Sequence, residues 1–230
     1  DDIIFFDEFG GNFLSNFYAN IDLGLNITKA NKFKQFNVAL VAGYLARKWS
    51  ADSYFNILRS NQDDTNPIQR TGGGANYRYF LPKNWYVSGA LDLLSNTEQV
   101  LQLRTTVKTG VGYFVFRNND LFWGFGAGGS LNNENYTNDT PKRTSFELYI
   151  ASDFTLINIP DFDLTTNIFV YPSLTESGRW RVDYLINTKY DLPMDFYVGL
   201  NFTLNYDNQP AEIGKEVDYV FGVSFGWEWP

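Results

Sequence analysis

The 230-residue chain contains 18% aromatic residues but no cysteine and no histidine, and its formal net charge is −8. These values exclude disulfides and thiolate metal sites. They also argue against nucleic-acid binding, which needs a basic surface to neutralise phosphates. No apolar run reaches the roughly 20 residues of a membrane-spanning helix.

Residues 1–12 precede the first regular pattern of the chain and include the apolar run Ile3-Ile4-Phe5-Phe6. We expect a periplasmic segment here, which acts as a linker, an extra edge strand or a plug. The remaining residues, 13–230, are expected to form one domain. No signal peptide is visible, so we expect the mature form of an exported protein or a fragment of it.

Alternation of apolar and polar residues begins near residue 15 and recurs almost to the end of the chain. In the first segment Phe17, Ala19 and Ile21 alternate with Asn20 and Asp22. Strands of soluble sandwiches usually have about 5–6 residues, whereas tilted membrane strands need about 9–11. Turn residues divide the pattern into twelve expected strands: 15–28, 33–48, 51–61, 68–80, 85–96, 103–116, 121–133, 143–156, 162–174, 179–190, 195–206 and 216–229.

The connections between these strands alternate between short and long. Short turns rich in Pro, Asn and Asp fall at 81–84, 117–120, 158–161 and 191–194, and longer polar loops fall at 62–67, 132–142 and 207–215. Outer-membrane barrels have short periplasmic turns and long external loops, so both chain ends are predicted to be periplasmic. Aromatic girdles are expected at the strand ends: Trp85, Trp123, Phe162, Phe196, Trp227 and Trp229 on the periplasmic side, and Tyr171, Trp180, Tyr206 and Tyr219 on the external side.

The same alternation places a set of charged residues on the inward face: Asp92, Arg104, Lys108, Glu147, Asp153, Arg181, Asp183 and Glu228. One interpretation is a narrow channel for small solutes. The other is a paired electrostatic core that closes the barrel, in which Arg104 and Arg181 have carboxylate partners, for example Asp183, Asp153 or Glu147. The mixture of signs favours the second, because selective pores for charged solutes usually carry a ring of one sign.

The residues give little support for catalysis, for phosphate binding by glycine-rich segments or for calcium binding. Without histidine, the usual general base near neutral pH is missing, and the pairs Asp161/Asp163 and Asp183/Asp191 are only nominal acid–base candidates. The glycines at 72–74 and at 126, 128 and 129 open no helix, so we expect crowded or sharply curved strands there. Oxygen-rich residues at 132–139 and 63–66 could suit Ca²⁺, but they lack the spacing of an EF-hand loop, and we expect solvated loops.

The last third of the chain resembles a known family. It contains the turn Asp191-Leu192-Pro193, the segment Asn205-Tyr206-Asp207-Asn208 followed by Pro210, the pair Asp218-Tyr219, and the closing Gly226-Trp227-Glu228-Trp229. With the earlier Tyr79-Phe80-Leu81-Pro82 leading into Trp85, these features resemble the domain of unknown function 481 family, whose members include salt-induced outer-membrane proteins. The resemblance implies an outer-membrane barrel and carries no known chemistry. This chain departs from the usual barrel end by closing on Pro230.

The sequence therefore predicts an all-β fold, a transmembrane antiparallel up-and-down β-barrel of about twelve strands in the outer membrane of a Gram-negative bacterium. We expect a non-enzymatic structural or accessory component without cofactors, and a narrow solute channel is the alternative. The expected partners are outer-membrane lipid, lipopolysaccharide and other outer-membrane proteins, and no nucleic acid.

Overall fold

The computed structural model describes residues 16–28, 33–62, 66–118, 120–210 and 214–227. These residues form twelve strands and one short 3-10 helix, η3, at Pro193–Asp195. The strands are β1 (Phe17–Thr28), β2 (Phe33–Leu45), β3 (Trp49–Asn61), β4 (Ile68–Phe80), β5 (Trp85–Asn96), β6 (Leu101–Arg117), β7 (Leu121–Tyr136), β8 (Arg143–Ile159), β9 (Phe162–Pro172), β10 (Trp180–Leu192), β11 (Phe196–Asp207) and β12 (Val217–Trp227).

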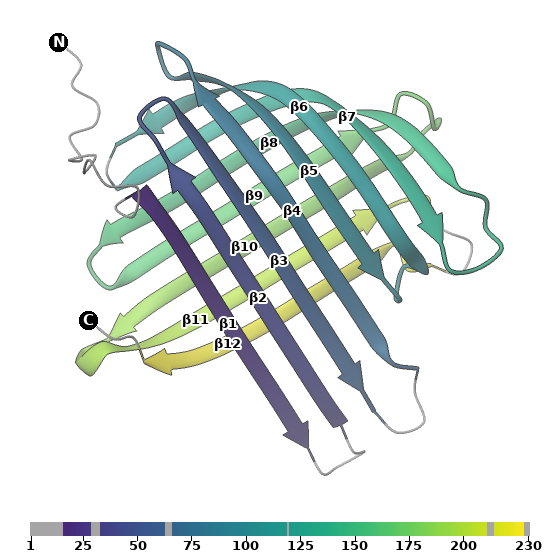
Figure 1. The fold of residues 1–230 in the computed structure, drawn as a ribbon, viewed down its shortest axis with the longest axis horizontal. Coiled ribbons are helices and arrows are strands. Elements are labelled where there is room, and N and C mark those ends of the chain that lie inside the picture. Colours follow the sequence, from purple (N-terminus) through teal and green to yellow (C-terminus); the bar gives the residue numbers. More distant parts are fainter. Residues whose placement is uncertain (1–15, 29–32, 63–65, 119, 211–213, 228–230) are drawn as a thin grey trace.

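All twelve strands belong to one antiparallel sheet whose spatial order is the order of the chain (Figure 1). This up-and-down meander confirms the predicted fold class. The expected segment 1–12 and residues Glu228 to Pro230 lie outside the described residues. In the described part of the chain, no helix is long and apolar enough to cross a membrane.

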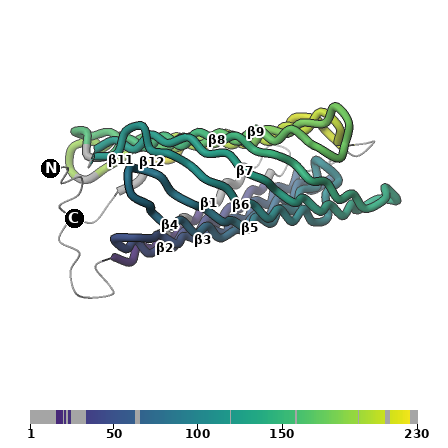
Figure 2. Tube along the Cα trace, turned by 90° about the horizontal axis from the view of Figure 1, so that it is seen from above, coloured from purple at the N-terminus to yellow at the C-terminus, as the bar shows by residue number. Residues whose placement is uncertain are grey.

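The sheet curls into a half-barrel with two facing layers (Figure 2). Strands β1–β5 lie in one layer and β8–β12 in the other, and β6 and β7 connect them. Register shifts interrupt the pairing of β5 with β6 and of β6 with β7, and such bulges increase the local bend of a sheet. The sheet order ends at β1 and β12, which pair with β2 and β11 among the described residues.

Inward glycines at this bend make room for large rings. A Cβ atom on Gly112 would overlap the ring of Tyr86, and one on Gly128 would overlap the backbone carbonyl of Thr109. The rings of Tyr86 and Tyr149 therefore lie where side chains of β6 and β7 would otherwise stand. The expectation of crowded strands at the glycine runs is confirmed at Gly128.

The two faces of the sheet have opposite chemistry. The outward face exposes large apolar side chains on every strand, and Leu23, Phe225 and Ile150 are 72%, 68% and 62% exposed. The inward face is polar, and its arginines and carboxylates include the most deeply buried side chains of the described chain. The alternation predicted from the sequence has this same register, as Phe202 pairs with Phe221 and Asn201 with Gly222.

Two expectations about the strand ends were wrong. Strand β7 continues to Tyr136, because Asn132, Glu134 and Tyr136 keep the alternation and point inward, so the loop expected at 132–142 begins only after Tyr136. Tyr171 is 1% exposed and packs inside on Arg181, and so it does not belong to the external girdle. Trp85, Trp180 and Tyr219 do lie exposed at strand ends.

Candidate functional site

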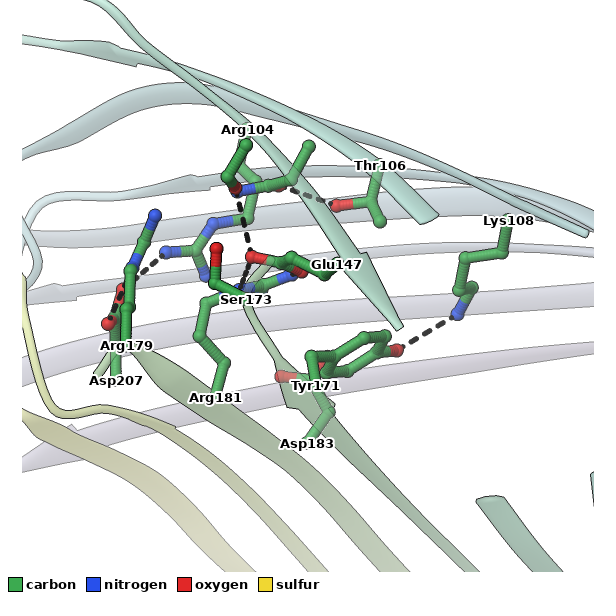
Figure 3. Close-up of polar contacts among 12 residues, drawn as sticks. Arg104, Thr106, Lys108, Glu147, Tyr171, Ser173, Arg179, Arg181, Asp183 and Asp207 are labelled. Atoms are coloured by element: carbon green, nitrogen blue, oxygen red, sulfur yellow. Dashed lines mark hydrogen bonds and ion pairs between the residues drawn. The ribbon is translucent and has the colours of Figure 1, made fainter. Parts of the chain in front are cut away.

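The candidate site is the inward face of the sheet, where charged side chains from opposite layers meet. Seven of the eight residues expected there are described, and all seven have polar partners within the sheet. Glu228 lies outside the described residues. Figure 3 shows the part of this network that extends from Arg179 and Asp207 to Lys108.

Four charged residues form a quartet near the long loops: Arg104, Glu134, Arg179 and Asp207. The Nη2 atom of Arg179 donates to Glu134 Oε1 at 2.8 Å and to Asp207 Oδ2 at 2.5 Å. Arg104 contacts the same two carboxylates, with its Nε 2.7 Å from Glu134 Oε1 and its Nη2 3.3 Å from Asp207 Oδ2. Two positive and two negative charges therefore share a site in which no side chain is more than 7% exposed.

The quartet joins strands that are far apart in the sheet. Arg104 belongs to β6 and Glu134 to β7, whereas Arg179 precedes β10 and Asp207 ends β11. Burial opposes the charge of Arg179, but hydrogen bonds to Asp207 and the charge of Glu134 prevail and raise the pKa of Arg179 above its usual value. The quartet thus ties the connecting strands β6 and β7 to the layer of β8–β12.

A second pair lies beside the quartet. Arg181 Nε donates to Glu147 Oε1 at 3.1 Å, and Arg181 Nη2 donates to Glu147 Oε2 at 2.7 Å. Ser145 donates a further hydrogen bond to Glu147, and the Arg181 guanidinium lies 4.8 Å from the ring centre of Tyr171. Glu147 is thus one of the three carboxylates expected for the arginines. The partners of Arg104, in contrast, are Glu134 and Asp207, neither of which was expected.

Further toward the middle of the sheet, Lys108 lies between carboxylate and aromatic groups. Its Nζ atom is 2.6 Å from Asp92 Oδ2, 3.3 Å from the hydroxyl of Tyr171 and 4.4 Å from the ring centre of Phe169. The hydroxyl of Tyr54 donates to the other oxygen of Asp92 at 2.8 Å. The carboxylate of Asp92 and the aromatic faces both attract the ammonium group of Lys108.

The remaining inward acids have amide or arginine partners. Asp153 accepts from Asn167 at 2.7 Å and from Arg78 at 3.4 Å, and Asp183 accepts from Asn205 at 2.6 Å.

A third cluster of charged side chains was not predicted from the sequence. In it Asp218 of β12 accepts from Arg70 of β4 at 2.5 Å and from Asn96 of β5 at 2.6 Å, which ties the two layers together.

The space left among these side chains is small. A cavity of about 40 Å³ lies between Arg78, Tyr86, Lys108, Tyr149 and Asp153. One water takes about 30 Å³ of liquid volume, so this cavity admits water but no sugar or amino acid. The side chains around this cavity leave no room in it for a larger solute.

The described residues of the inward face do not form a metal site, and the residues expected for other chemistry have polar partners instead. Among the described residues, no three acidic side chains lie close enough together to hold a metal ion. Asn132 and Glu134, which belong to the calcium candidate 132–139, bind Thr106, Arg104 and Arg179 instead. Of the nominal acid–base pairs, Asp183 accepts from Asn205 and Asp191 pairs with Lys189 at 3.1 Å.

The comparisons with known proteins give a family but no activity. The family model described as "Protein of unknown function, DUF481" matches residues 21–229. No curated protein matches the chain. Among solved structures, the beta domain of the Bordetella autotransporter BrkA is 12% identical with a TM-score of 0.38, and the alignment covers 90% of this chain and 95% of that domain.

Proposed function

Because this chain belongs to the family of proteins of unknown function DUF481, whose name specifies no activity, we propose its function from its physical chemistry. We propose that it is a non-enzymatic β-barrel of the outer membrane of a Gram-negative bacterium, a structural or accessory component whose interior is closed by ion pairs.

The observation that carries this proposal is that the protein buries charged side chains and exposes apolar ones, the reverse of a soluble domain. Soluble domains bury apolar side chains and seldom expose a contiguous apolar patch above a few hundred Å². Here Arg179, Glu134 and Glu147 are completely or almost completely buried, while Leu23, Phe225 and other outward apolar side chains are more than 60% exposed. A hydrocarbon solvent outside and a polar interior account for both features.

Strand length and loop asymmetry support the same location. The strands have 11–17 residues, enough for a tilted membrane strand. Short turns such as 46–48 and 81–84 lie at one end of the sheet, and the longer connections 137–142 and 173–179 lie at the other (Figure 1). We assign the short-turn end, where β1 begins and β12 ends, to the periplasm.

A narrow solute channel is the competing function. The balanced quartet and the cavity of about 40 Å³ favour a closed interior. A catalytic role has no support either, because the chain contains no histidine and the inward acids serve ion pairs and hydrogen bonds.

Heat-modifiability and flotation test the proposed location. The folded protein should float with lipid vesicles, and unheated samples in detergent should migrate differently from boiled ones on a gel. A folded monomer that stays soluble without detergent would overturn the proposal.

A further inference from the structure

An apolar hollow of about 530 Å³ lies on the outward face of β2–β5. The hollow is shallow and open to the outside, so an occupant would lie along the sheet rather than inside it. Small outward residues form the base of the hollow, namely Ala42, Ala51, Ser53, Ala75 and Gly89, and large ones border it, namely Phe17, Tyr44, Tyr77 and Leu91.

The turns beside this hollow are basic. Turn 46–48 carries Arg47 and Lys48, and turn 81–84 carries Lys83, all of them exposed. The backbone amide of Phe80 donates to the carbonyl of Lys48 at 2.8 Å, so the two turns lie side by side. In the part of the chain that the structure describes, none of the three basic side chains forms an ion pair.

The basic turns are close to the hollow and confined to its side of the sheet. Tyr44, which borders the hollow, is three residues from Arg47, so their Cα atoms are at most about 10 Å apart. At the same end of the opposite layer, Asp161 and Asp191 lie beside the turns, and Lys189 is paired with Asp191 at 3.1 Å. The three cations therefore favour an anionic occupant whose apolar part enters the hollow.

We infer that the hollow binds a phospholipid with an anionic headgroup. One acyl chain lies on the small side chains of β2–β5, and the phosphate faces Arg47, Lys48 and Lys83. Each basic residue near an anionic lipid surface contributes about 1 kcal/mol, which is about fivefold in affinity. This inference rests on the proposed function, because the outward face meets lipid only if the sheet spans a membrane.

Native mass spectrometry of the full chain in neutral detergent tests the inference. The probes are phosphatidylglycerol and phosphatidylcholine with identical acyl chains. We expect one retained phosphatidylglycerol per protein and weaker retention of phosphatidylcholine. Lys48→Glu and Lys83→Glu should each weaken phosphatidylglycerol binding by at least about fivefold. Ala75→Phe, which fills the hollow, should weaken both lipids.

Matched variants serve as controls. Lys142→Glu reverses a charge at the opposite end of the sheet, and Ala127→Phe enlarges an exposed outward alanine of β7 that does not border the hollow. Both should bind as the unmodified protein does. Equal retention of the two lipids, or equal losses in the control variants, would overturn the inference.

Two other results also decide against it. Retention of lipopolysaccharide alone, or a dimer that Ala75→Phe breaks in lipid-free protein, would assign the hollow to a different occupant. Vesicle flotation separates this inference from the proposed function. Protein that floats without preferring phosphatidylglycerol contradicts the lipid site alone, whereas protein that never floats contradicts both.

Discussion

Arg181 and Glu147 form a two-point ion pair that spans a whole strand. The contacts are 3.1 and 2.7 Å long, and the residues belong to β10 and β8, between which β9 lies. Tyr171 of β9 packs against the guanidinium from the same side of the sheet. The ion pair and the ring thus connect three neighbouring strands, and both charged side chains are buried.

Arg181→Ala should destabilise the protein by about 3–5 kcal/mol, because it leaves the carboxylate of Glu147 buried without a charged partner. Arg143→Ala is the control. Its side chain donates to the backbone carbonyl of Gln209 at 2.6 Å, and losing one such bond costs about 1 kcal/mol. Urea unfolding of the vesicle-bound protein gives both free energies. Equal losses from the two variants would show that the buried pair has no special role.

The double variant Arg181→Met with Glu147→Leu separates the cost of a lone charge from the value of the pair. Replacing both partners by apolar side chains removes the uncompensated charge, so most of the stability lost in Arg181→Ala should return. A double variant as unstable as the single one would mean that the ion pair itself stabilises the native state.

The register of β11 can be tested with two adjacent residues. Phe202 faces outward and Asn201 donates to Asn187 on the inward face at 2.5 Å. Phe202→Arg should cost about 2–4 kcal/mol if the ring lies near the middle of the bilayer, and Asn201→Ser should cost less. A silent Phe202→Arg combined with a damaging Asn201→Ser would reverse the two faces.

Alternation and turn residues predicted the order of the twelve strands and most of their bounds to within about two residues, because each strand has one face toward hydrocarbon and one toward a polar interior. Strands β4 and β5 match their expected ranges 68–80 and 85–96. The end of β7 was missed, because Asn132 to Tyr136 has the composition of a loop. Its even-numbered residues continue the inward pattern, and that signal could have identified Glu134.

The sequence predicts which charged residues point inward better than it predicts which of them contact one another. Alternation shows that Arg104 points inward, but its partner Asp207 follows 103 residues later and meets it only because the sheet curls. Arg70 and Asp218 likewise come from opposite layers. The sequence carries no local signal for such contacts, since they depend on curvature and on the tilt of the strands.

Curvature at β6 should depend on Gly112. A Gly112→Val side chain would overlap the ring of Tyr86 and should destabilise the protein by about 1–3 kcal/mol. Adding Tyr86→Ala should recover part of this loss, because the space that the ring occupied becomes free. Gly222→Ala is the control, as nothing lies within 4 Å of the added atom, and it should change stability by less than about 0.5 kcal/mol. No recovery in the double variant would exclude the ring as the cause.

The orientation of the barrel can be measured on intact cells. An epitope inserted at Asn138, in the connection between β7 and β8, should be labelled from outside, because long connections of outer-membrane barrels are external. An epitope at Pro193, in η3, should be labelled only after the outer membrane is permeabilised. The opposite result would invert the topology.

The closed interior is the central claim, and planar-bilayer recording tests it most directly. The unmodified protein, with insertion verified by heat-modifiability, should conduct little, because the quartet of Arg104, Glu134, Arg179 and Asp207 and the pair of Arg181 with Glu147 occupy the inward face near the long loops. A variant with all four quartet residues changed to alanine should conduct more, which shows that the recording detects an open barrel. A stable open channel of porin-like conductance in the unmodified protein would contradict the account and establish a solute channel.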